Sequence, residues 1–132
     1  MIQIAILGFG TVGTGVAKVV AENARQIERK LGEPLQVKAI FVRTFRDGPF
    51  RQLMTGDFAK IEEDSAIRVV VETIGGVEAA YEYTRRALSA GKHVVTANKQ
   101  LVAERGCELL ALAKEKNVNY LFEASVGGGI PI

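Results

Sequence analysis

Cysteine is almost absent from this 132-residue chain, and Cys107 is its only one, so no disulfide bond can form within it. A single cysteine favours a reducing, cytoplasmic location. No apolar run approaches the roughly 20 residues that a membrane-spanning helix needs. The first ten residues, MIQIAILGFG, lack the basic start and long apolar stretch of a signal peptide. The sequence therefore predicts a protein that neither is secreted nor spans a membrane.

Charge of one sign is also scarce. The 17 lysines and arginines nearly balance the 15 aspartates and glutamates, which leaves a net charge of +2. With no long basic run, neither a nucleic acid nor a membrane surface is indicated as a partner. His93 is the only histidine, and since no second ligand or catalytic partner accompanies it, we predict a structural role. We expect Cys107, in the middle of a predicted helix, to be a small packing residue.

What is present is an alternation of short apolar runs and amphipathic segments. The runs predict strands over residues 2–7, 35–42, 67–72, 93–96 and 118–122. Helical spacing predicts helices over 11–30, 77–90 and 101–116, the first packing through Val12, Val16, Val19 and Val20. Residues 44–65 look irregular, apart from a short helix around 50–54. Continuously apolar strands that alternate with helices predict an α/β fold with a doubly wound parallel sheet.

The first predicted strand ends in a glycine pattern, Gly8-Phe9-Gly10-Thr11-Val12-Gly13, which matches G-x-G-x-x-G. Between a strand and a helix, this pattern is typical of the loop that binds a dinucleotide diphosphate in a Rossmann fold. Gly8 permits the turn, Gly10 lets the phosphates approach the backbone, and Gly13 lets the helix pack on the strand. The alternative is a plain strand–helix turn.

The end of the second predicted strand bears on the choice between NADP and NAD. NAD-binding domains commonly have a carboxylate there for the ribose hydroxyls, but this strand ends in Phe41-Val42-Arg43-Thr44. Arg43 suits a 2′-phosphate, because its planar guanidinium can bind two phosphate oxygens. We therefore expect NADP, with NAD as the alternative, and Arg46 and Lys60 could assist. Arg43 could instead be a solvated surface residue.

Loops that follow the later strands should meet at the same edge of the sheet. In residues 72–76, small residues could accommodate a ribose, or the glycines could simply serve a turn. In the Thr96-Ala97-Asn98-Lys99 loop, Lys99 could hold a carboxylate or a reacting oxygen, or lie on the surface. In residues 123–132, Glu123 precedes a glycine-rich run whose carbonyls suit a hard cation such as sodium, although from spacing alone a flexible hinge explains the glycines better.

Four segments in this order resemble homoserine dehydrogenase, namely GFGTVG, VVETIGG, VVTANKQLVA and FEASVGGGIPI. The last two are far more specific than the glycine pattern, and together the four span the chain. The resemblance implies NAD(P)-dependent interconversion of L-homoserine and L-aspartate 4-semialdehyde, in threonine and methionine biosynthesis. It implies hydride transfer between the nicotinamide and the carbon that bears the hydroxyl.

The resemblance also implies roles for individual residues. Cofactor contacts would fall on Gly8, Phe9, Gly10, Thr11, Val12, Gly13, Arg43, Thr73, Thr96 and Lys99. Lys99 would also be catalytic, and a sodium ion would be held by Glu123, Val126, Gly128 and Ile130.

Residues 1–132 would then form one dinucleotide-binding domain of a longer protein. A substrate and dimerisation domain would follow residue 132, the full-length protein would be a homodimer, and the chain alone would be inactive. Another NAD(P)-dependent dehydrogenase, or a nucleotide-sensing domain without catalysis, is the alternative. A nucleotide-sensing domain would have no need of the TANK and GGGIP segments.

Overall fold

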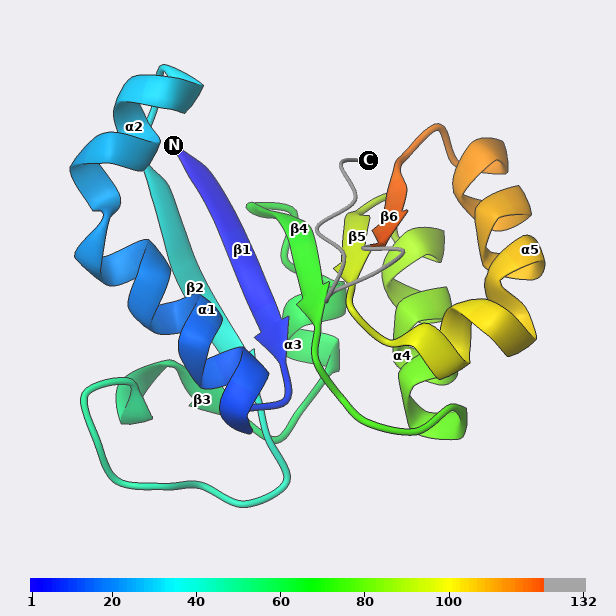
Figure 1. Ribbon diagram of the computed structural model, residues 1–132, viewed down its shortest axis with the longest axis horizontal. Helices are drawn as coiled ribbons and strands as arrows, with labels where there is room; N and C mark the ends of the chain where they lie inside the picture. The colour runs from blue at the N-terminus through cyan, green and yellow to red at the C-terminus, as the bar shows by residue number, and fades with distance from the viewer. Residues whose placement is uncertain (123–132) are drawn as a thin grey trace.

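The computed structural model describes residues 1–122, and the segment 123–132 lies outside the described residues (Figure 1). Its sheet contains β1 (Ile2–Leu7), β2 (Leu35–Phe41), β3 (Met54–Thr55), β4 (Ile67–Glu72), β5 (His93–Thr96) and β6 (Tyr120–Phe122). The strands lie in the order β3-β2-β1-β4-β5-β6, and every neighbouring pair is parallel. The predicted doubly wound α/β fold is therefore confirmed.

Helices cover both faces of this sheet, as Figure 1 shows. They are α1 (Thr11–Glu22), α2 (Ala24–Leu31), the 3₁₀ turn η1 (Arg51–Leu53), α3 (Ala59–Glu62), α4 (Glu78–Ser89) and α5 (Lys99–Glu115). One apolar core lies between α1 and strands β1, β2 and β3, and a second lies under α3, α4 and α5. Because the chain winds outward from β1 in one direction and from β4 in the other, the carboxyl ends of these two central strands flank the switch point.

The first helix differs from the prediction in two ways. Asn23 ends α1 and precedes α2, so the expected helix over 11–30 is broken there. The buried face of α1 consists of Gly13, Ala17 and Val20, whereas Val12 and Val19 are each 54% exposed. The prediction is confirmed for Val20, and Val16 packs against the core. It was wrong for Val12 and Val19, because the buried positions 13, 17 and 20 have the same helical spacing one residue round the helix. Glycine and alanine face the sheet instead, since their small size lets α1 lie close to it.

Residues 44–65 contain more structure than predicted. The short helix expected around 50–54 is present as η1, but β3 and α3 were missed. β3 has two residues, and Met54 and Thr55 pair with Ile40 and Phe41 of β2. Elements of two to four residues are too short to show a period in the sequence.

Two single-residue predictions have opposite outcomes. The structural role of His93 is confirmed, because its Nδ1 accepts a hydrogen bond of 3.0 Å from the Asn119 amide and joins β5 to the segment before β6. The packing role of Cys107 is wrong, because this residue is exposed on α5. Among residues 1–122, no helix has the length and apolar character that crossing a membrane requires.

Candidate functional site

The phosphate loop, residues 8–13, lies at the switch point of the sheet. Gly8 follows β1 with a φ of +89°, a conformation that side chains disfavour, and its amide donates to Phe41 O at the end of β2, at 2.8 Å. α1 then starts, and its Thr14 amide donates to Gly10 O at 2.9 Å. Amides that precede this bond have no helical carbonyl to pair with, so they and the positive end of the helix dipole can bind an anion.

The glycines of this loop differ in what surrounds them. A Cβ on Gly13 would lie 2.4 Å from Gly8 O and 2.9 Å from Thr73 Oγ1, so only glycine fits there. A Cβ on Gly10 would meet no atom within 4 Å, because the space over this residue is open. A buried, close-packed Gly13 and an open Gly10 are what a bound diphosphate requires of this loop.

Thr73, the residue directly after β4, holds the phosphate loop in place. Its amide and its hydroxyl both donate to Leu7 O, at 2.9 Å and 2.7 Å. The hydroxyl also lies 3.2 Å from Gly8 O. The end of β1, the phosphate loop and the segment after β4 are therefore joined at one point.

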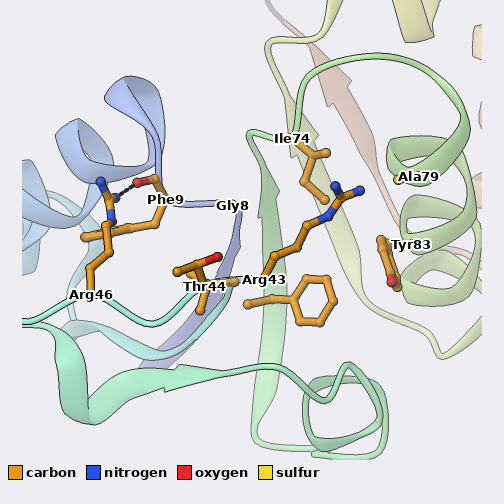
Figure 2. Close-up of a pocket in the computed structure, with 10 residues that line it drawn as sticks. Gly8, Phe9, Arg43, Thr44, Arg46, Ile74, Ala79 and Tyr83 are labelled. Atoms are coloured by element: carbon orange, nitrogen blue, oxygen red, sulfur yellow. Dashed lines mark hydrogen bonds between the residues drawn. The ribbon is translucent and has the colours of Figure 1, made fainter.

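Beside the phosphate loop lies a cavity of about 280 Å³. It is lined by Gly8, Phe9, Phe41, Val42, Arg43, Thr44, Arg46, Ile74, Ala79 and Tyr83. Figure 2 shows the Arg43 side chain extending from the end of β2 toward Ile74 and Tyr83. Arg46 turns the other way, donates to Phe9 O, and has its guanidinium carbon 5.3 Å from the centre of the Phe9 ring. The mostly apolar lining suits a flat ring such as adenine, with one guanidinium available for a phosphate.

A second group of polar residues follows β4 and β5. Glu72 ends β4 with 1% of its surface exposed, and its Oε1 accepts a hydrogen bond from Thr96 Oγ1 at 2.5 Å. Thr96 is 2% exposed, and its Oγ1 also accepts from the Asn98 amide at 2.9 Å. Asn98 caps α5, because its side chain accepts from the Leu101 amide at 3.0 Å.

Burial determines the direction in which the pKa of Glu72 is shifted. Loss of water raises the pKa of this carboxyl above its ordinary value, and the hydrogen bond from Thr96 opposes only part of that shift. The Ile74 amide and the Asn98 side chain also oppose it. Within residues 1–122, however, no group has hydrogen-bonding geometry to Oε2. Burial therefore shifts the titration of this carboxyl toward the neutral acid.

This chain matches a family model described as homoserine dehydrogenase, NAD binding domain, over residues 8–123. The chain belongs to the homoserine dehydrogenase family. It is 45% identical to the homoserine dehydrogenase of Corynebacterium glutamicum, with 99% of this chain and 30% of that enzyme covered. The chain therefore spans only a minor part of the length of this relative.

Solved structures of the family have the same fold. The S. aureus homoserine dehydrogenase at pH 7.0 is 39% identical with a TM-score of 0.85, covering 93% of this chain and 32% of that one. A hyperthermophilic archaeal homoserine dehydrogenase in complex with NADPH is 28% identical with a TM-score of 0.75, covering 93% and 44%. The family and the fold are thus established for the described domain.

The site residues predicted from the resemblance fall into three groups. Gly8, Phe9 and Arg43 line the cavity, and Gly10, Thr11 and Val12 are exposed at the start of α1. Gly13, Thr73 and Thr96 lie behind the site, where Thr73 and Thr96 use their hydroxyls within the protein. Lys99 is exposed on the first turn of α5 and does not line the cavity. The predicted sodium ligands Glu123, Val126, Gly128 and Ile130 lie outside the described residues. Contact of each residue with a ligand stays a prediction.

Sequence reasoning missed the supporting residues. It considered Arg46 only as an assistant to Arg43, yet Arg46 binds the phosphate loop itself. It passed over Glu72 as part of a turn and Asn98 as part of a motif. Asn98 carried a readable signal, because asparagine is among the preferred caps of a helix. Among residues 1–122, no group of three acidic, histidine or cysteine side chains could hold a metal ion.

Proposed function

We propose that this chain is the cofactor-binding part of an enzyme that interconverts L-homoserine and L-aspartate 4-semialdehyde. The observation that carries the proposal is the phosphate loop with its open Gly10, in a chain of the homoserine dehydrogenase family. When bound, a nicotinamide cofactor supplies the hydride chemistry of such an enzyme. The chain's own residues bind it: amides of residues 10–13 take the diphosphate, and the cavity beside Arg43 takes the adenosine.

Lys99 has a separate role in this proposal. It is an exposed ammonium at the start of α5, one residue after the loop that Asn98 holds. There it would fix a substrate oxygen or carboxylate by a charge-assisted hydrogen bond. The family's remaining substrate-binding acids and proton-transferring lysine would come from the domain expected after residue 132.

Calorimetric titration of the chain with NADPH and NADH tests the cofactor site. We expect at least one of them to bind, and we expect no oxidation of homoserine by residues 1–132 alone, because the expected substrate domain is missing. Oxidation of homoserine is then assayed with the protein that includes that domain. Binding of neither cofactor would contradict the site, while binding without activity of the longer protein would contradict the assigned reaction.

We propose NADP as the preferred cofactor, on the strength of Arg43. No carboxylate ends β2, and Arg43 lines the cavity that would take the adenosine. One relative of similar fold forms a complex with NADPH.

The variant Arg43→Ala tests this preference. We expect NADPH to bind about tenfold or more weakly, because a hydrogen-bonded charge pair is lost, and NADH to change by no more than about twofold. Arg68→Ala is the matched control, since Arg68 is exposed on β4. Titration of both cofactors gives the comparison, and equal losses for the two would exclude a role at the 2′-phosphate.

Other parts of the proposal rest on the resemblance to the family. They are the sodium ion at Glu123, Val126, Gly128 and Ile130, the homodimer, and the substrate domain after residue 132. The cytoplasmic location rests on the single cysteine. Sedimentation of the full-length protein measures its oligomeric state directly.

A further inference from the structure

A closed set of hydrogen bonds joins the segment after β4 to the segment after β5. Glu72 accepts from Thr96, and Thr96 accepts from the Asn98 amide. The Asn98 side chain returns to the first segment, where it donates to Ile74 O at 3.1 Å and to Gly76 O at 2.6 Å. Two segments that are more than 20 residues apart in the sequence are thereby held in one geometry.

Lys99 lies next to the residues of this hydrogen-bonded set, but its side chain makes none of the set's hydrogen bonds. Its neighbour Asn98 is bound through its amide and its side chain, and the Leu101 amide is bound to Asn98 Oδ1. The backbone that carries Lys99 is therefore fixed on both sides, although its side chain is exposed. The hydrogen bonds that fix Thr96 and Asn98 therefore also fix the position of the Lys99 backbone.

Burial of Glu72 in this position lowers the stability of the folded protein. A carboxyl with 1% exposure loses its hydration, and an apolar side chain would fill the same space without that penalty. Glu72 is buried away from solvent, so we expect it to act on the site through the hydrogen bonds of Thr96 and Asn98. A buried polar group that costs stability beside a ligand site is a candidate for a role in that site.

We propose that Glu72 is a positioning residue, which through Thr96 and Asn98 sets the segments 73–76 and 97–99 for the nicotinamide half of the cofactor. The inference rests on the proposed function, since it assumes that a nicotinamide cofactor binds. It assigns to Glu72 an effect on one half of the ligand only. The adenosine half lies at Arg43 and the phosphate loop, whose residues take no part in these hydrogen bonds; of the residues that line the cavity, Ile74 is joined to them, through its carbonyl oxygen.

The test compares two ligands that differ by the nicotinamide. NADPH and 2′-phospho-ADP-ribose are titrated into wild-type protein and the variants Glu72→Leu and Thr96→Val, with NADH and ADP-ribose as a second pair. Glu72→Gln and Thr96→Ser keep the Glu72–Thr96 hydrogen bond. Thr84→Val is the matched control, because Thr84 on α4 is also fully buried and its hydroxyl has no partner within residues 1–122.

We expect Glu72→Leu and Thr96→Val to weaken the nicotinamide-containing ligand about tenfold, the usual effect of losing one buried hydrogen-bond partner. The ligand without nicotinamide should change by no more than about twofold. Glu72→Gln and Thr96→Ser should recover most of the loss, and Thr84→Val should match wild type. Amide hydrogen exchange at Asn98 and Leu101 should become faster in the first two variants, while exchange at Thr14 stays the same.

Several outcomes contradict the inference. Equal losses for both ligands would indicate a general defect of the fold, and no loss for either would remove Glu72 from the site. If Glu72→Leu does not fold, Thr96→Val carries the same comparison. Wild-type protein that bound neither ligand would contradict the proposed function, whereas wild-type binding with no selective loss in the variants would contradict only the role of Glu72.

Discussion

Gly13→Ala should destabilise the protein and abolish cofactor binding, whereas Gly10→Ala should abolish binding and leave the fold intact. The added Cβ at Gly13 would lie 2.4 Å from Gly8 O, a distance that real Cβ atoms do not reach. Relief requires α1 to move away from β1, so we expect a loss of about 3 kcal/mol in the free energy of unfolding. The same methyl at Gly10 meets no protein atom, but it takes the space through which a diphosphate approaches the backbone.

Urea unfolding and calorimetric titration separate the two effects. Gly15→Ala is the matched control, because Gly15 is on the same helix and its added Cβ also meets nothing within 4 Å. Alanine suits a helix better than glycine by about 1 kcal/mol, so this variant should be as stable as wild type or more so, and should bind as well. If Gly10→Ala bound the cofactor like wild type, the diphosphate could not lie at this loop. If Gly13→Ala were as stable as wild type, the close contact of α1 with β1 would be wrong.

The sequence predicted the sheet because its strands carry two independent signals. Residues such as Val69, Val70 and Val71 are apolar on both sides of the strand, and three of the five predicted strands are followed by a predicted helix. Together these require a parallel sheet with helices on both faces. The phosphate loop was predictable for a similar reason, since a strand, a glycine pattern and a helix occur in the right order. Its steric basis at Gly13 then appears in the structure.

What the sequence could not give is the identity of long-range partners. Nothing in the residues around Thr73 indicates that its hydroxyl binds Leu7 O, 66 positions earlier. The pairing of Glu72 with Thr96 depends on β4 lying beside β5 in a given register, in which these two residues are opposite each other. Val12 and Val19 were wrongly placed on the buried face of α1 for a related reason, because helical spacing fixes an angle between residues but does not say which side meets the sheet.

The stability of the protein should fall as pH rises through the titration of Glu72, and Glu72→Gln should remove this fall. Burial raises the pKa of Glu72 in the folded protein above its ordinary value of 4.5. Between these two values the unfolded chain has released a proton that the folded protein still holds. Rising pH therefore favours the unfolded chain in that window, and the stabilisation present at acidic pH is lost. Above the raised pKa the loss is complete and stays constant.

Chemical unfolding of wild type and Glu72→Gln from about pH 4 to about pH 8 measures the effect as a difference in slope. We expect the free energy of unfolding of the variant, relative to wild type, to rise across this range, because only wild type loses the stabilisation of a protonated buried acid. Among described residues, the titratable group that senses Glu72 is Tyr120, whose own pKa is raised by burial and by the Glu72 charge, so it stays neutral. Glu115→Gln, an exposed change on α5, is the control. Parallel stability curves for wild type and Glu72→Gln would mean that Glu72 is solvated, and the buried acid beneath the Thr96–Asn98 segment would then be wrong.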